Sequence, residues 1–500
     1  MSSHSQRVLA GLVFFGGAAS LGAEIAAARL MAPYFGASTL VWANTIGVVL
    51  VALAGGHALG GRLADKHPDL EVLARTAVVA ACGLAAIPFV SGPLLELAVP
   101  ALDNIDAGAF VGSLLAVLVL LAFPILLLGM LTPWAVRLSI TSVDGAGRVA
   151  GRLSALSTVG SLVGVFASAL LLIPFIGTQR TFLVFAASLA GAGALAYGRR
   201  ALVVPAALLG LLLLPPGVTK PEGEGDKLLY EAESAYQYIR VLERDGERSL
   251  ELNEGQAVHS VYEADSVLTG LVFDGYLVAP FTVLERAPER LAMLGNAAGS
   301  VSRAYGRYFP ETQIDGVEID PRVTEAGERF FALRTSNPRL RVHSEDARPF
   351  LRQAEPGSYD VIAVDAYRQP YIPFYLTTRE FFELARSRLR PGGVLIVNVG
   401  HVPDDDRLER SLTASIDTAF GDVIRWPIRQ KNTLLIASDT PPTGERLGRV
   451  AVSLPEELGP LAAEAVNGLA EPLTGGPVYT DDRAPVEWLI DASILRYAGE

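Results

Sequence analysis

The sequence predicts a multi-pass α-helical membrane domain, followed by a small β-hairpin sheet and an α/β Rossmann-like domain. Three observations predict this organisation. Long apolar runs fill residues 1–214, short alternating runs separated by turn residues follow, and from about residue 284 apolar strands alternate with helices. We therefore expect four segments: a transmembrane helical domain at 1–214, a linker at 215–227, a small antiparallel β domain at 228–283 and a Rossmann-like domain at 284–500.

The apolar runs of the first segment predict six membrane spans. A bilayer-spanning helix needs about 20 mostly apolar residues, and the runs that fit lie near 8–31, 40–61, 73–90, 110–131, 153–174 and 180–197. The first run is too long for a cleavable signal peptide, and further spans follow it. A seventh apolar run, 201–214, is shorter and ends at Pro215-Pro216. Six and seven spans both stay open at this point.

Charged residues in the connecting loops predict the orientation of the helices. The segment Gly60–Lys66 resembles the cytoplasmic loop signature of major facilitator transporters. Basic residues gather near this loop and after the fourth run, at Arg62, Lys66, Arg75, Arg137, Arg148 and Arg152. The loop 91–109 has Glu96, Asp103 and Asp106 and no Lys or Arg. The positive-inside rule then places the N-terminus in the cytoplasm. Six spans would leave the C-terminal part there too, and seven would place it outside.

Composition excludes several classes of function. Residues 1–214 carry 11 Lys and Arg against 8 Asp and Glu, which leaves 30 against 45 in the rest of the 500-residue chain. A C-terminal part with a net charge of −15 does not suit nucleic acid, because phosphate binding needs a basic surface. The single cysteine, Cys82, forms no internal disulfide and no thiolate metal site.

Two ionisable residues lie within the apolar runs. An ionisable group in hydrocarbon is costly and usually faces the interior of the bundle. For Glu24, a structural ion pair with Arg29 or with another helix and a role in binding a polar solute both stay open. For His57, packing or an interfacial position is the favoured interpretation.

Two kinds of strand pattern divide the C-terminal part. Runs at 238–243, 249–252 and 257–262, separated by Asp245-Gly246 and Asn253-Glu254-Gly255, predict β-hairpins. Continuous apolar strands are then expected at 291–294, 314–319, 340–343, 359–364 and 394–399, with a helix around 378–389 stopped by Pro391-Gly392-Gly393. Buried strands that alternate with helices indicate a parallel sheet covered on both faces.

Polar residues follow each of these strands, which predicts a nucleoside site at one edge of the sheet. Ligands of open α/β sheets bind beyond the carboxyl ends of the strands. The turn from Gly295 to Gly299 lets the backbone approach a ligand closely. Glu318 lies 23 positions after Gly295, a spacing that suits hydrogen bonds from ribose hydroxyls. Asp346 and Asp365 complete a set of carboxylates at the same edge.

These motifs resemble those of spermidine synthases, the polyamine aminopropyltransferases, over roughly residues 228–440. The matching segments are Tyr236-Gln237-Tyr238-Ile239, Gly295–Ser300, Val317-Glu318-Ile319-Asp320, Asp346-Ala347 and Tyr359–Asp365. The whole layout resembles bacterial proteins in which a facilitator-like region is fused to a spermidine synthase. The resemblance implies that Gln237 contacts the nucleoside, Glu318 the ribose and Asp346 the adenine amino group. Gly295, Gly299, Asp320 and Ala347 belong to the same nucleotide site, and Asp365 is the implied catalytic acid residue.

The chain departs from the family pattern at two positions. The family turn is Gly-Gly-Gly-Asp-Gly-Gly, whose Asp helps to hold the cationic aminopropyl group, and this position is Ala298 here. The family also has Asp-Ser-Ser-Asp, whose second Asp helps to bind the acceptor amine, and Arg368 stands there instead. Arginine repels an ammonium and attracts a carboxylate or phosphate. Arg368 is therefore assigned to the substrate side of the site, and the resemblance places Tyr236 there as well. His259 and Tyr371 are further candidates there, with a surface loop and core packing as equal alternatives.

Three functions follow, in order of preference. The first is a transferase of polyamine biosynthesis, in the inner membrane of a bacterium, that moves an aminopropyl group from decarboxylated S-adenosylmethionine to an amine or polyamine acceptor without a metal. The second is a methyl or aminocarboxypropyl transferase that uses intact S-adenosylmethionine. The third is a transporter or sensor whose C-terminal domain binds a nucleoside without turnover. Membrane lipid is an expected partner, nucleic acid is not, and a homo-oligomer stays open.

Overall fold

The structure is a computed structural model that describes residues 3–35, 39–102, 108–140, 142, 145–196, 199–214, 220–253, 255, 257–367, 371–402 and 405–497. Asp103, Asp106 and Pro215-Pro216, which the sequence singled out, lie outside this description. The chain divides into two compact units. One unit comprises Met1–Pro221 with Glu233–Tyr238, and the other comprises Glu222–Ala232 with Ile239–Glu500.

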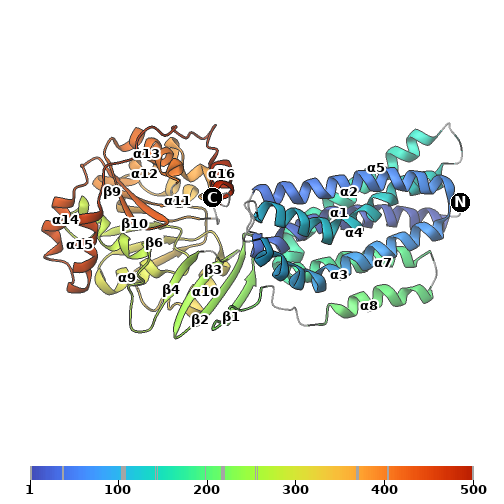
Figure 1. Ribbon diagram of the computed structural model, residues 1–500, viewed down its shortest axis with the longest axis horizontal. Helices are drawn as coiled ribbons and strands as arrows, with labels where there is room; N and C mark the ends of the chain where they lie inside the picture. The colour runs from blue at the N-terminus through green and yellow to red at the C-terminus, as the bar shows by residue number, and fades with distance from the viewer. Residues whose placement is uncertain are drawn as a thin grey trace. The chain divides into compact units, whose positions relative to one another are not determined.

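The first unit is a helical bundle (Figure 1). Its elements are α1 (Ser3–Phe35), α2 (Thr39–Lys66), α3 (Leu70–Leu102), α4 (Gly108–Ser139), α5 (Ala146–Ala167), η1 (Ser168–Leu172), α6 (Ile173–Ile176), α7 (Thr178–Ala194), η2 (Arg199–Leu202) and α8 (Val203–Leu211). Within the described residues, five helical segments are long and apolar enough to cross a membrane: His4–Phe35, Leu40–Lys66, Leu70–Leu95, Val111–Ser139 and Ala146–Ile176. These segments indicate that the unit associates with a membrane.

The sixth predicted span and the seventh apolar run fall on shorter helices. Helix α7 has 17 residues, the lower limit for a span at about 1.5 Å per residue. Helix α8 has 9 residues and covers about 14 Å, roughly half of a hydrocarbon layer. The run at 201–214 therefore does not form a full span by itself.

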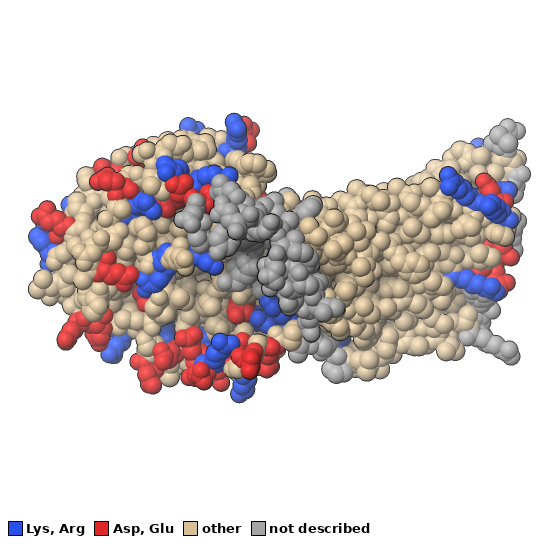
Figure 2. Space-filling model, in the orientation of Figure 1, with Lys and Arg blue, Asp and Glu red and all other residues tan. Residues whose placement is uncertain are grey.

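Glycines allow the helices of the bundle to touch through their backbones. A Cβ atom at Gly56 of α2 would lie 2.2 Å from the Leu126 carbonyl oxygen of α4, and one at Gly164 of α5 would lie 2.1 Å from the Ala18 carbonyl oxygen of α1. Small residues are what helices need for close approach in lipid. The basic loop residues lie where α2 and α4 end and where α3 and α5 begin, which is one end of the bundle. Figure 2 shows charged side chains gathered there and an uncharged wall beside them.

A four-stranded sheet begins the second part of the chain, in the order β1 (Lys227–Glu233), β2 (Tyr238–Arg244), β3 (Glu247–Leu252) and β4 (Val258–Tyr262). The turn between β2 and β3 is made by Asp245 and Gly246, with φ values of 52° and 90°. Two consecutive positive φ angles form the hairpin turn that matches the twist of antiparallel strands. The predicted hairpins are present, and β1 is an additional strand that the sequence did not indicate.

The main sheet has seven strands in the order β10-β11-β9-β8-β5-β6-β7. Its parallel strands are β5 (Arg290–Leu294), β6 (Gln313–Val317), β7 (Leu340–His343), β8 (Tyr359–Val364) and β9 (Leu389–Gly400). Strands β10 (Val423–Arg429) and β11 (Asn432–Ser438) complete it, and β11 runs antiparallel to both of its neighbours. This is the Rossmann-like α/β fold that the sequence predicted, extended by two strands.

Helices cover both faces of this sheet (Figure 1). Alternate residues of β5 face opposite clusters, because Leu291 and Met293 pack on one side while Ala292 and Leu294 pack on the other. The first side is covered by η3 (Val272–Leu277), η4 (Ala279–Thr282), α9 (Ser300–Tyr308), α14 (Gly444–Ala451), η6 (Glu456–Leu458) and α15 (Gly459–Gly468). The second is covered by α11 (Ala347–Gln353), η5 (Phe374–Leu376), α12 (Arg379–Arg388), α13 (Arg407–Phe420) and α16 (Val486–Tyr497), while α10 (Pro321–Phe330) packs against the four-stranded sheet.

Candidate active site

The order of the strands reverses between β5 and β8. From β5 the chain adds β6 and β7 on one side, and β8 and β9 follow on the other. Leu294 is paired with Val317 and with Val364, so the residues after these strands emerge at one edge. Such a switch point is where open α/β sheets bind ligands.

The Gly295 turn is tied to both neighbouring strands. The Gly295 and Asn296 amides donate to the Val317 carbonyl at 2.9 and 3.0 Å, and the Asp365 amide donates to the Leu294 carbonyl at 2.8 Å. Gly295 has φ +88°, and a Cβ atom there would lie 2.3 Å from the Asp365 carbonyl oxygen. Only glycine fits this position, because the backbone of the next strand occupies the space of a side chain.

Gly299 is the N-cap of α9 in the left-handed conformation, with φ +95°. Strand β4 supports the turn before it, since the Ala298 amide donates to the Ser260 hydroxyl at 3.0 Å. Ala298 is fully buried within the apolar cluster that contains Val323 and Ala326. Its side chain therefore lies in a core, where a carboxylate without a partner would be costly.

Glu318 follows β6 and is turned toward the Gly295 turn. Its carboxylate accepts hydrogen bonds from the Ala297 amide and the Asp320 amide, both at 3.0 Å. Burial disfavours the ionised carboxylate and raises the pKa of Glu318 to about 7, although these amides oppose the shift. Near neutral pH, Glu318 can therefore accept hydrogen bonds from ligand hydroxyls or carry a proton.

Two other predicted carboxylates cap helices. Asp320 is fully buried and accepts from the Arg322 amide at 3.0 Å at the start of α10. Asp346 accepts from the Arg348 amide at 2.9 Å at the start of α11, where Ala347 is the first residue. An Asp before a helix satisfies amides that have no partner within the helix.

Tyr375 reaches Asp346 from η5 and was not predicted from the sequence. Its hydroxyl donates to the other oxygen of Asp346 at 2.5 Å. Because Asp346 already accepts from the α11 backbone, this second bond fixes the orientation of the carboxylate.

Asp365 follows β8, beside the Gly295 turn. Its Oδ1 accepts from the Asn398 amide group at 2.7 Å, and the Asn398 oxygen accepts from the Asn432 amide group at 3.0 Å. Burial raises the pKa of Asp365 to about 6, and the hydrogen bond from Asn398 opposes the shift. At neutral pH the carboxylate is therefore mostly ionised and remains a usable proton acceptor.

Aromatic residues hold the segment around Asp365. The Tyr367 hydroxyl accepts from the Gly400 amide at 2.5 Å and donates to the Asn398 carbonyl at 3.1 Å. The Tyr276 hydroxyl donates to the Val364 carbonyl at 3.2 Å. Burial keeps the pKa of Tyr276 and of Tyr367 well above the usual tyrosine range, so both hydroxyls stay protonated. The sequence did not indicate Asn398, Asn432, Tyr276 or Tyr367.

The remaining predicted residues do not follow the strands that carry Glu318 and Asp365. Tyr236 and Gln237 form the turn between β1 and β2, where their amides donate to the Ser234 hydroxyl at 3.0 Å, and this turn groups with the helical unit. His259 is half-buried on β4. Tyr371 is buried and its hydroxyl donates to Asp491 of α16, which supports the packing alternative. Arg368 lies outside the described residues.

Metal ligation has no support in the part of the chain that the structure describes. No group of three or more His, Cys, Asp or Glu side chains is arranged there to hold a metal ion.

Known proteins resemble the part of the chain that contains this site. The family model "Spermine/spermidine synthase domain" matches residues 277–425. A polyamine aminopropyltransferase of Vibrio vulnificus is 31% identical over 269 residues, which cover 52% of this chain and 87% of that protein. The chain belongs to the polyamine aminopropyltransferase family. This membership places it among transferases.

Other aminopropyltransferase relatives match the same part of the chain. A probable polyamine aminopropyl transferase of Bifidobacterium longum is 32% identical over 305 residues, which cover 54% of this chain and 65% of that protein, just under two thirds. Among solved structures, a probable spermidine synthase from Corynebacterium glutamicum is 20% identical. It has a TM-score of 0.39 and covers 49% of this chain and 96% of that chain.

Proposed function

We propose that the protein is a membrane-bound transferase that moves an aminopropyl group from decarboxylated S-adenosylmethionine to a small amine or polyamine. The observation that carries this proposal is Asp365, whose carboxyl group is held by Asn398 at the switch point beside the Gly295 turn. Membership of the aminopropyltransferase family supports the same reaction.

In this proposal, Glu318 accepts hydrogen bonds from the ribose hydroxyls of the donor, and Asp346, fixed by Tyr375, contacts the adenine amino group. Asp320, Ala347 and Gly299 shape the start of the helices around the nucleoside. Gln237 and Tyr236 are assigned to the nucleoside and substrate sides of the site from the family resemblance.

The reaction needs no oxidant and no metal. The lone pair of the acceptor amine attacks the aminopropyl carbon bonded to the sulfonium sulfur, so that a C–N bond forms while the C–S bond breaks. The electron pair of the broken bond stays on sulfur, which becomes a neutral thioether. Asp365 orients the attacking amine and accepts the proton that it loses, and proximity of the two substrates supplies much of the rate.

A second candidate is transfer from intact S-adenosylmethionine. It is favoured by Ala298, whose side chain lies in an apolar cluster where the family pattern has an acidic residue. Arg368 would then bind the carboxylate that intact S-adenosylmethionine carries. In this case the transferred group is methyl or aminocarboxypropyl.

The donor assay separates the two candidates. The full chain in lipid nanodiscs is incubated with 1,4-diaminobutane and either donor, and the released nucleoside thioether is quantified. Release of methylthioadenosine from the decarboxylated donor alone is the expected result. Product from intact S-adenosylmethionine alone would establish the second candidate and overturn the first.

We further propose that the transferase unit faces the cytoplasm of a bacterial inner membrane, where S-adenosyl nucleotides are made. The place where the donor is made carries this proposal. The positive-inside rule alone would not, because the basic ends of α2 and α4 lie at the other end of the bundle from Arg29, which contacts Ala235. Two reporters are fused after residue 500, one that works only in the cytoplasm and one that works only outside the membrane. We expect the first to be active and the second to be inactive. Activity of a reporter that works only outside the membrane would contradict the proposal.

A further inference from the structure

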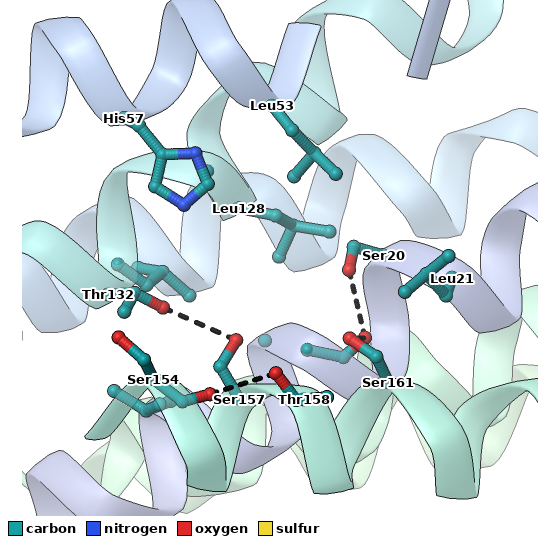
Figure 3. A pocket seen from close by; sticks show the side chains of 15 residues that line it. Ser20, Leu21, Leu53, His57, Leu128, Thr132, Ser154, Ser157, Thr158 and Ser161 are labelled. Carbon is teal, nitrogen blue, oxygen red and sulfur yellow. Dashed lines mark hydrogen bonds between the residues drawn. The ribbon is translucent and has the colours of Figure 1, made fainter. Parts of the chain in front are cut away.

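Helices α1, α2, α4 and α5 of the helical unit surround a cavity of about 250 Å³ (Figure 3). Helices α1, α2 and α4 contribute Ser20, His57 and Thr132. Helix α5 contributes four hydroxyl groups on two successive turns, at Ser154, Ser157, Thr158 and Ser161. The volume corresponds to about eight water molecules at about 30 Å³ each. Polar groups within a membrane bundle are costly and commonly mark a path or site for a solute.

The hydroxyls of this cavity present mainly acceptor oxygens. Ser20 and Ser161 both donate to the Gly17 carbonyl, at 2.8 and 3.2 Å, and Thr158 donates to the Ser154 carbonyl at 3.1 Å. Thr132 donates to the Ser157 hydroxyl at 3.4 Å. A hydroxyl whose single proton is already donated offers only its lone pairs to a ligand. The cavity therefore suits a solute that brings its own N–H or O–H donors.

A carboxyl side chain lies one helical turn beyond the lining of the cavity. Among the described residues, its lining contains no Lys, Arg, Asp or Glu side chain. Glu24 lies one turn beyond Ser20 on the face of α1 that lines the cavity, since it follows Ser20 by four positions and Gly17 by seven. Glu24 is 7% exposed, and within the described part of the chain its side chain makes no hydrogen bond or ion pair.

The expected Glu24–Arg29 pair is therefore not formed by the described residues. The Arg29 guanidinium instead donates to the Ala235 carbonyl. A carboxylate buried in hydrocarbon without a partner stays ionised only if a cation comes to it. The carboxylate follows Ser20 on α1, the other acceptor oxygens lie on α5 across the cavity, and both require the same kind of ligand.

We propose that this cavity binds a small primary ammonium cation. The hydroxyl oxygens at Ser20, Thr158 and Ser161 accept its N–H donors, and Glu24 supplies the opposite charge. The site is separate from the transferase edge of the sheet and does not depend on the reaction proposed there. It gives the helical unit a ligand of its own.

A local chemical readout tests this proposal. Ser157→Cys is introduced with Cys82→Ser, so that the full chain in nanodiscs carries one thiol, at the cavity. The rate of its modification by the uncharged reagent methyl methanethiosulfonate is measured with and without 1,4-diaminobutane. At ten times the Kd, the diamine should slow modification about tenfold, because the rate follows the unoccupied fraction. 1,4-Butanediol, which has the same length and no charge, should not slow it.

Three variants sharpen the test. Glu24→Gln should abolish protection by the diamine and Glu24→Asp should retain it, while Arg148→Cys, exposed at the start of α5, should react at one rate throughout. Thr158→Val, which removes one acceptor, should weaken protection if Glu24→Gln does not fold. The proposal is overturned if the cavity thiol does not react, if butanediol protects equally, or if the diamine still protects Glu24→Gln.

Discussion

The hydrogen bond from Asn398 to Asp365 makes a quantitative prediction. Replacing Asn398 by Ala removes a 2.7 Å donor from a carboxylate that burial already destabilises. A hydrogen bond to a charged group contributes about 1.5–3 kcal/mol, and about 1.4 kcal/mol corresponds to one pKa unit. Because Asp365 is half-buried and water can replace part of the lost bond, we expect the lower end of this range. The pKa of Asp365 should rise from about 6 to about 7.

The sign of the effect follows from the proposed role. Only the ionised carboxylate accepts a proton, so the acidic limb of kcat/KM should move up by about one pH unit. The ionised fraction would fall about fivefold at pH 6, about twofold at pH 7, and hardly at all above pH 8.5. The variant-to-parent ratio of kcat/KM at each pH is the measurement, because titration of the acceptor amine cancels in that ratio.

Two further variants control this experiment. Asn432→Ala removes only the support of Asn398 and should shift the limb by less. Asn467→Ala changes an exposed asparagine of α15 and should shift nothing. A ratio that does not change with pH in Asn398→Ala, or a limb that moves to lower pH, would refute the proton-accepting role of Asp365.

Three other substitutions give separate outcomes. Glu318 has a folded pKa of about 7 against 4.5 in the unfolded chain, so its ionisation costs the native state on the order of 3 kcal/mol above pH 7 and nothing below pH 4.5. Glu318→Gln should therefore reduce the loss of thermal stability between pH 4.5 and pH 7, and it should weaken nucleoside binding. An unchanged dependence of stability on pH, or an unchanged affinity, would contradict this role of Glu318. Gly295→Ala should abolish nucleoside binding, since its Cβ would meet the Asp365 carbonyl at 2.3 Å; isothermal titration that finds parental affinity would exclude this close packing. Arg368→Asp should improve use of a diamine acceptor if the protein is an aminopropyltransferase, and a higher KM for the diamine would contradict that.

The fold could be predicted from the sequence where the residue pattern within a single strand identifies that strand. The strands at 291–294, 340–343 and 359–364 match β5, β7 and β8 within a residue. For β5 and β8 the mostly apolar run between turn residues is typical of a strand buried on both faces. Strands β10 and β11 were missed. Pro427, Arg425 and Arg429 interrupt the apolar run of β10, as is typical of an edge strand.

Of the site, the sequence predicted only those residues whose position follows from the end of a strand. Residues that follow parallel strands must meet at one edge, which is why Glu318 and Asp365 could be named from the sequence. Asn398 lies inside a predicted apolar strand, and Asn432 lies 34 positions further along. Their contact depends on the antiparallel return of β11, which no local pattern indicates. The separation of Glu24 from Arg29 likewise depends on tertiary packing.

The central claim is that Asp365 promotes group transfer at a nucleoside site built by other residues. It is tested most directly by measuring Asp365→Asn in the full chain, with donor affinity and turnover determined on one preparation. We predict an affinity within about twofold of the parent and a turnover lower by about 10² to 10⁴, the usual contribution of a general base. Full turnover in Asp365→Asn, with either donor, would contradict the claim.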